Sequence, residues 1–290
     1  MGARDTNRTM VESRVSSEGC TLEKFSIFSK SMGREIKVIV ILPPEYNSDP
    51  EKKYPILYTL HGRGAPYDTF SQMPPLRKDL KTKPMIVTCL DADKASWYLN
   101  SPNLQEDHSN EAEKKGVSGF TPVRSLFTTF FFDEFILCVD KYYRVNKVQR
   151  MITGFSMGGF GAFHYMLAKP EMFVSISSLS GAFYSLLEEK GKEHMKPLLG
   201  LFSQNRAKYE ETDLFNRIKK RADEKEKLPP IFLHCGTEDP LLKNNEEMNE
   251  FLQKNGFTSG LVKTAGKHDW SFWVGASAGI IDFHWKSLTK

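Results

Sequence analysis

The feature that most constrains the fold is the segment 151–161, which reads MITGFSMGGFG. A short apolar run leads into a serine that has a glycine two residues away on either side, and the helix-like stretch 162–168 follows. This order predicts a strand, a sharp turn and a helix, with Ser156 at the apex of the turn. Gly154 and Gly158 lack the Cβ atoms that would collide across such a turn. The Ser156 hydroxyl is then held at a helix N-terminus, where backbone N–H groups favour negative charge, and this placement predicts a nucleophile.

The remaining chain alternates between strand-like and helix-like stretches. Apolar runs predict strands at residues 25–28, 36–42, 55–60, 84–90, 151–153, 174–179, 231–235 and 261–264. Helix-like patterns cover residues 130–142, 159–168, 241–255 and 272–288. Near-continuous apolar runs are typical of parallel strands that are buried on both faces. The sequence therefore predicts an α/β fold, with a mostly parallel central sheet, antiparallel N-terminal edge strands and helices on both faces.

Two polar segments interrupt this alternation. Residues 97–125 carry a charged stretch, and residues 182–228 are rich in lysine and glutamate. We expect small cap-like insertions here, which either contribute to specificity or are simply solvated helices and loops. Residues 1–20 are polar and predict a flexible tail, so that residues 21–290 form a single domain.

Composition excludes several classes of function. Forty basic residues face 36 acidic ones in 290 residues, and no basic run is interleaved with aromatic residues, so no nucleic-acid partner is expected. The polar N-terminus contains no apolar core, which predicts no membrane partner and a cytoplasmic protein, although a secreted protein whose signal has been removed would look the same. No Cys/His spacing indicates a zinc site, and no metal or organic cofactor is expected.

A serine nucleophile needs a base to remove its proton and an acid to orient that base. Asp239 and His268 each follow a predicted strand, in the segments GTEDP and GKHDW. The resulting order Ser156, Asp239, His268 is the chain order of α/β-hydrolases. Glu238 is a competing acid beside Asp239. Asp269 is a weaker competitor because it adjoins the histidine and is expected to point away.

The oxyanion of an acyl-transfer intermediate needs N–H donors. The backbone of Met157, directly after the serine, and that of Arg63, in the loop after the strand at 55–60, are the predicted pair. The Arg63 side chain either meets a polar substrate or is an ordinary exposed arginine. His61 is expected to brace this loop. Trp97 and Tyr98 either line the substrate pocket or pack in the core.

Several motifs carry a family resemblance. They are LPPEY at 42–46, YPILY at 54–58, LHG at 60–62, SWYLNSP at 96–102, GFSMGG at 154–159, CGTED at 235–239 and GKHDW at 266–270. From about residue 25 to the C-terminus, the chain resembles the putative-esterase branch of the α/β-hydrolases. That branch includes tributyrin-type carboxylesterases, S-formylglutathione hydrolases, feruloyl and acetylxylan esterases, and mycolyltransferases.

The resemblance implies the same functional residues as the motifs alone. It implies a triad of Ser156, Asp239 and His268, and an oxyanion hole formed by Arg63 and Met157. Arg63 itself departs from the family pattern, in which an apolar residue or glycine would stand there. This departure leaves the polarity of the pocket mouth open.

The function that follows is that of a serine carboxylic-ester hydrolase with an acyl-enzyme intermediate. Its substrates would be small-molecule or carbohydrate-linked esters of small acyl, acetyl or hydroxycinnamoyl groups. Alternatives are thioester hydrolysis of the S-formylglutathione type, acyl transfer to a sugar, and a catalytically inactive fold that serves as a binding module. The motifs leave the acyl group, the alcohol and the oligomeric state open.

Overall fold

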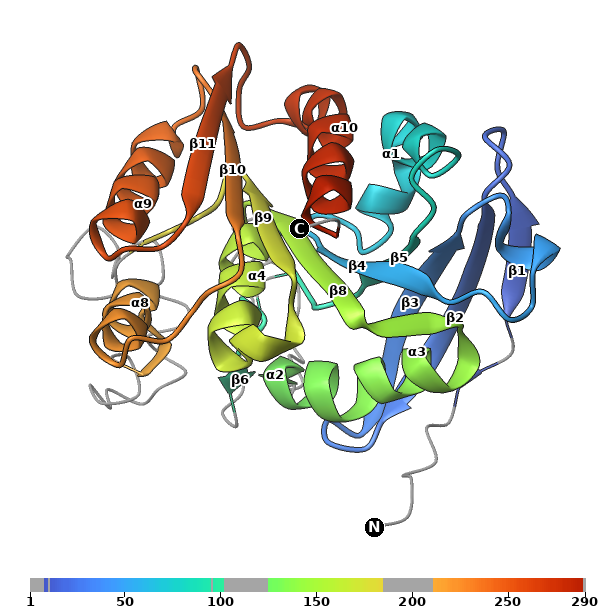
Figure 1. Cartoon of the computed structure of the whole chain (residues 1–290). Helices are drawn as coiled ribbons and strands as arrows, with labels where there is room; N and C mark the ends of the chain where they lie inside the picture. Colours follow the sequence, from blue (N-terminus) through green and yellow to red (C-terminus); the bar gives the residue numbers. More distant parts are fainter. Residues whose placement is uncertain (1–7, 10, 95, 102–124, 185–210, 289–290) are drawn as a thin grey trace, which may run out of the picture.

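A nine-stranded mixed sheet runs through the molecule, with helices on both of its faces (Figure 1). The computed structural model describes residues 8, 9, 11–94, 96–101, 125–184 and 211–288. In sheet order, the strands are β1 (Glu12–Val15), β2 (Thr21–Ser29), β3 (Arg34–Leu42), β5 (Ile86–Leu90), β4 (Tyr54–Leu60), β8 (Val145–Phe155), β9 (Ser175–Leu179), β10 (Ile231–Gly236) and β11 (Ser259–Thr264).

The first strands pair antiparallel and the later ones parallel. β1, β2, β3 and β5 form antiparallel pairs in that order, whereas every pair from β5 through β4, β8, β9 and β10 to β11 is parallel. The predicted α/β fold with an antiparallel N-terminal edge is therefore confirmed. In a separate two-stranded sheet, β6 (Asn100–Ser101) pairs antiparallel with β7 (Ser125–Leu126).

Helices bury both faces of the sheet. The helical elements are α1 (Pro74–Asp79), α2 (Phe127–Phe130), the π-helical turn η4 (Phe131–Phe135), α3 (Ile136–Tyr142), α4 (Met157–Ala168), α8 (Leu214–Asp223), α9 (Leu242–Lys254) and α10 (Trp270–Ser287). Short 3-10 turns lie at η1 (Tyr46–Ser48), η2 (Thr69–Gln72) and η5 (Pro170–Met172). Helices α1 and α10 pack on one apolar face of the sheet, and α3, α4, α8 and α9 pack on the other (Figure 1).

The N-terminal prediction needs a correction. Residues 12–15 were expected in a flexible tail, but they form β1 and pair in register with residues 21–24 of β2. Cys20 is fully buried, as are the other three cysteines, and all four are free thiols. The apolar pattern does not predict this strand, because all four of its side chains are exposed. The hydrogen bonds between its backbone and β2 hold it at the edge of the sheet.

The two predicted insertions are described in part. Residues 102–124 and 185–210 lie outside the described residues. Within the second insertion, residues 214–223 form α8, whose N-cap Asp213 accepts a hydrogen bond from the Asn216 N–H at 3.0 Å. Leu214 and Ile218 on this helix join the main core, so at least this part of the insertion is packed on the domain.

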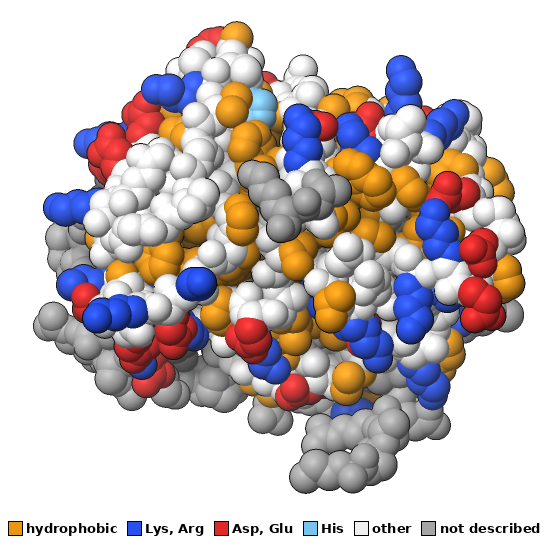
Figure 2. All heavy atoms as spheres, viewed as in Figure 1, with side chains coloured by type: hydrophobic (Ala, Val, Ile, Leu, Met, Phe, Trp, Pro, Cys, Tyr) orange, Lys and Arg blue, Asp and Glu red, His pale blue; other side chains and the backbone are white. Residues whose placement is uncertain are grey.

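The surface carries charges of both signs. On the face drawn in Figure 2, lysine and arginine side chains alternate with aspartate and glutamate rather than gathering into one patch. Within the described residues, no helix is both long and apolar enough to cross a membrane.

The topology collects loops at one edge of the sheet. β4, β8, β9, β10 and β11 are parallel, so the loops that follow them leave from the same edge. Side chains from five segments that are far apart in sequence are therefore brought together there.

The turn between β2 and β3 is anchored by a buried carboxylate that has no motif in the sequence. Glu134, on η4, accepts hydrogen bonds from the Lys30 N–H at 2.7 Å, the Ser31 N–H at 3.0 Å and the Ser29 hydroxyl at 3.3 Å. This carboxylate ties the antiparallel edge to the helical layer.

We expect Glu134→Ala to lower the free energy of unfolding by about 2 kcal/mol or more, because the donors of the turn, which include the buried Ser29 hydroxyl, lose their acceptor. The neighbouring Asp133 is exposed, and Asp133→Ala is the matched control, expected to change stability by less than about 0.5 kcal/mol. Denaturant unfolding followed by circular dichroism measures both. Equal effects of the two substitutions would contradict the anchoring role.

Candidate active site

Ser156 stands on a strained turn between β8 and α4. Its φ is +54° and its ψ is −119°, a conformation that is costly for a residue with a side chain. A Cβ at Gly154 would collide with the Gly158 carbonyl group, and one at Gly158 would collide with the Leu60 carbonyl oxygen at the end of β4. Both glycines are therefore required, as the sequence predicts, and the second is needed against the neighbouring strand rather than across the turn.

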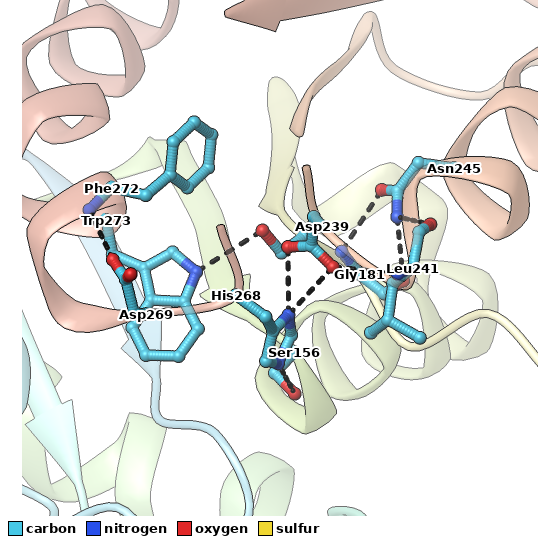
Figure 3. Close-up of polar contacts among 10 residues, drawn as sticks. Ser156, Gly181, Asp239, Leu241, Asn245, His268, Asp269, Phe272 and Trp273 are labelled. Atoms are coloured by element: carbon cyan, nitrogen blue, oxygen red, sulfur yellow. Dashed lines mark hydrogen bonds and ion pairs between the residues drawn. The ribbon is translucent and has the colours of Figure 1, made fainter. Parts of the chain in front are cut away.

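Three side chains form a continuous chain of hydrogen bonds (Figure 3). The Nε2 atom of His268 lies 3.0 Å from the Ser156 hydroxyl oxygen. The Nδ1 atom of the same ring lies 2.9 Å and 3.1 Å from the two carboxylate oxygens of Asp239. The structure thus brings together the serine, histidine and aspartate that the sequence singles out.

The carboxylate of Asp239 is fully buried. Burial by itself would raise the pKa of Asp239, but hydrogen bonds from His268, Ser180 and the Leu241 N–H outweigh it and hold the pKa below its usual range. The Leu241 N–H donates to one carboxylate oxygen at 2.7 Å. At neutral pH the group facing His268 is therefore a carboxylate, the form that accepts a hydrogen bond from the Nδ1–H group.

The competing acids lie elsewhere. The side chain of Glu238 is 60% exposed and lies 3.9 Å from the Lys267 ammonium group. Asp269 caps α10 by accepting a hydrogen bond from the Phe272 N–H at 3.0 Å. Of the three acids considered from the sequence, only Asp239 reaches His268.

A buried asparagine that the sequence does not single out supports the aspartate loop. Asn245, on α9, donates to the carbonyl groups of Gly181 at 3.0 Å and Leu241 at 2.8 Å, and it accepts from the Gly181 N–H at 3.1 Å (Figure 3). This amide clamps the loop after β9 to the loop after β10. Asn245 stands four residues after Leu241 on an ordinary amphipathic helix, and nothing in the local sequence pattern predicts that it supports this loop.

The predicted oxyanion donors lie on either side of the serine. Met157 begins α4, and Arg63 follows Gly62, where an added Cβ would lie 3.3 Å from the Ser156 Cβ. Within the described part of the chain, neither the Met157 N–H nor the Arg63 N–H donates a hydrogen bond. Both donors remain available for an oxygen atom bound at the serine.

His61 and Tyr98 brace the loop that carries Arg63. The Ala92 N–H donates to His61 Nε2 at 3.1 Å, which leaves the proton on Nδ1 to donate to the Gly62 carbonyl at 2.8 Å. Burial lowers the pKa of His61, so the ring is neutral. The Tyr98 hydroxyl donates to the His61 carbonyl at 2.8 Å.

Trp97 and Tyr98 are both buried in the core. Tyr98 has no exposed surface, and its ring fills the space above Gly161, where a Cβ would collide with it. Trp97 is 4% exposed and packs edge-on against Phe160 at 5.4 Å between ring centroids. Both therefore take the core-packing alternative, and Tyr98 acts on the site through the loop above it.

No resident metal centre is evident in the ranges that the structure describes. Among these residues, no three His, Cys, Asp or Glu side chains are grouped so that they could hold a metal ion.

The sheet topology, the serine at a strand-to-helix turn, and the hydrogen-bonded histidine and aspartate define an α/β-hydrolase. Residues 29–280 match the family model described as "Putative esterase", and the chain belongs to this family. Its members and structural neighbours are named esterases or serine hydrolases, and this protein is a serine esterase.

Three similar proteins differ in the substrate that their names state. An acetyl esterase of Caldicellulosiruptor saccharolyticus is 23% identical over 291 residues, which cover 91% of this chain and 97% of that protein. The structure of an S-formylglutathione hydrolase from Agrobacterium tumefaciens superposes with a TM-score of 0.78 at 17% identity, covering 97% of this chain and 100% of that one. A ferulic acid esterase superposes with a TM-score of 0.70 at 21% identity, covering 92% and 98%.

The strained turn generates a prediction. Gly158→Ala should abolish most esterase activity and destabilise the fold, because the new Cβ meets the Leu60 carbonyl group in the sheet, which has no room to shift. Gly279→Ala is the matched control, since no described atom lies within 4 Å of a Cβ there and α10 favours alanine by up to about 1 kcal/mol. Turnover of a p-nitrophenyl ester and the melting temperature measure both variants. A fully active Gly158→Ala enzyme would contradict the steric argument.

Proposed function

We propose that the protein hydrolyses carboxylic esters by two-step acyl transfer, with Ser156 as nucleophile, His268 as general base and acid, and Asp239 as the group that orients His268. The observation that carries the proposal is the continuous hydrogen-bond chain from the Ser156 hydroxyl through His268 to a buried carboxylate. The strained elbow supports it, because backbone strain of this kind is maintained where function requires it.

In the first step His268 Nε2 takes the hydroxyl proton while the Ser156 oxygen attacks the ester carbonyl carbon. The N–H groups of Met157 and Arg63 stabilise the negative oxygen of the tetrahedral intermediate. His268 then gives its proton to the departing alcohol, which leaves an acyl-serine. A water molecule repeats the sequence on the acyl-serine, releases the carboxylic acid and restores the Ser156 hydroxyl.

The proposed substrates are esters of small acyl groups, including acetyl and hydroxycinnamoyl esters linked to a carbohydrate. The similarity to an acetyl esterase over nearly the whole chain supports the acetyl group, and the similarity to a ferulic acid esterase supports the hydroxycinnamoyl group. The partner is thus a small-molecule or carbohydrate-linked ester.

A second candidate is thioester hydrolysis, which the structural likeness to an S-formylglutathione hydrolase favours. The same catalytic groups would act on either substrate, because the leaving sulfur needs less protonation than a leaving alcohol oxygen. Acyl transfer to an alcohol acceptor differs only in the second step. A catalytically inactive binding module is the least favoured alternative, because all three residues of the triad are present and hydrogen-bonded.

A hydrolysis panel with Ser156→Ala alongside tests the chemistry. Short and long p-nitrophenyl esters, methyl ferulate, acetylated xylo-oligosaccharide and S-formylglutathione are the substrates. We expect turnover of at least one oxygen ester, reduced by roughly 10³-fold or more in Ser156→Ala. A Ser156→Ala enzyme that keeps most of the activity would overturn the nucleophile. If kcat/KM is higher for S-formylglutathione than for every oxygen ester, the proposed substrate becomes a thioester instead of an ester.

A pair of neighbouring substitutions tests the acid. Asp239→Asn should lower kcat by roughly 10³- to 10⁴-fold. The asparagine amide favours the wrong tautomer of the His268 ring, and it carries no negative charge that could stabilise the imidazolium. Glu238→Gln, one residue away and solvent-exposed, is the control and should stay within about twofold of the wild type. Steady-state kinetics at saturating p-nitrophenyl acetate compare the two. A larger loss of kcat in Glu238→Gln than in Asp239→Asn would identify Glu238, instead of Asp239, as the acid that orients His268.

A further inference from the structure

One aromatic side chain contacts the segments that carry Ser156 and His268, and it also contacts the loop after β9. The indole of Trp273, on α10, stacks on Phe155, the residue before the nucleophile, at 4.4 Å between centroids and 27° between planes. It meets the ring of His268 edge-on, at 5.1 Å and 89°. Its Nε1–H donates to the Ser180 hydroxyl oxygen at 3.3 Å.

Ser180 is a fixed acceptor for this indole. It follows β9, has no exposed surface and has a φ of +49°, and its backbone N–H donates to the His234 carbonyl at 2.8 Å. A hydroxyl that accepts from the indole keeps its own proton to donate. The Ser180 hydroxyl is also among the groups that lower the pKa of the Asp239 carboxyl.

The proposed base needs support beyond its two hydrogen bonds. The bonds from Nε2 to Ser156 and from Nδ1 to Asp239 lie on opposite sides of the ring and leave it free to rock about the line that joins them. The side chain of His268 is 26% exposed. The residue stands two positions after Gly266, whose φ is +150°. A perpendicular ring packed against the imidazole removes this rocking motion.

We propose that Trp273 and Ser180 are positioning residues of the esterase: Trp273 fixes the plane of the His268 ring, and Ser180 locks the indole to the loop that faces Asp239. This inference rests on the proposed function of the triad. It assigns roles to two residues outside the proposed triad and oxyanion hole. Misplacement of a catalytic group by about 1 Å can cost roughly 100-fold in rate, so such support is of catalytic consequence.

Substitutions that remove the link while keeping most of the packing test the inference. Trp273→Phe retains a ring between Phe155 and His268 but loses the N–H donor, and Ser180→Ala loses the acceptor. We expect each to lower kcat on p-nitrophenyl acetate roughly tenfold, with KM within about twofold of the wild type. Both substitutions break one link, so the double variant should be no more than about twofold slower than the slower single variant.

Two matched controls separate positioning from packing. Trp285→Phe makes the same change on the same helix, against the same core cluster. Ser177→Ala removes a buried hydroxyl from β9, one that bonds Thr153 and His284 instead of the site. Both should keep kcat within about twofold of the wild type, even where the melting temperature falls.

A spectroscopic readout completes the test. The proton shared by His268 Nδ1 and Asp239 should give a downfield ¹H NMR signal in the wild type, which broadens in Trp273→Phe and Ser180→Ala and persists in the two controls. Unchanged kcat and an unchanged NMR signal in both Trp273→Phe and Ser180→Ala would overturn the inference. It would also be overturned if the fold-loss of kcat in the double variant equalled the product of the fold-losses in the two single variants. Full activity of Ser156→Ala, measured in parallel, would instead overturn the proposed function beneath it.

Discussion

The close approach of the Gly158 backbone to the Leu60 carbonyl group is the contact on which the rest of the site depends. It places the first turn of α4 directly against the end of β4, so that the elbow after β8 and the loop after β4 share one small space. Ser156 and Met157 then lie on one side of that space and Gly62 and Arg63 on the other. No other residue than glycine fits, because the opposing atoms belong to the hydrogen-bonded backbone of a central strand, which is too rigid to move.

A second layer of contacts holds this arrangement from within the core. Tyr98 reaches the carbonyl group of His61, and the neutral His61 ring closes its own loop onto Ala92. On the other side, Asn245 joins the loops that follow β9 and β10. Each of these groups is buried and hydrogen-bonded, so each fixes one loop geometry instead of a range of geometries. The loops around the proposed triad have irregular backbone conformations, but these hydrogen bonds fix their positions.

The sequence was sufficient for the features that depend on local pattern. Apolar runs and the glycine spacing predicted the central strands, the antiparallel edge, the elbow at Ser156, and Asp239 and His268 as its partners. What the sequence missed depends on tertiary proximity. β1 has only exposed side chains and therefore no pattern. Tyr98 stands in a motif, which suggested contact with substrate, yet its ring is needed above Gly161. Asn245 and Ser180 are ordinary polar residues whose importance appears only once their loops meet.

The donors around Asp239 explain how a buried carboxylate can serve a base that becomes positively charged. Besides His268, the groups that bond it are a backbone N–H and a serine hydroxyl, both of which are neutral. They keep the carboxylate ionised without cancelling its charge, whereas a lysine or arginine in the same place would have neutralised it. Lys267, which precedes His268 in the sequence, lies instead beside the exposed Glu238. In the proposed mechanism, the full negative charge is thus retained for the imidazolium that would form as Ser156 attacks, in an environment where water does little to screen it.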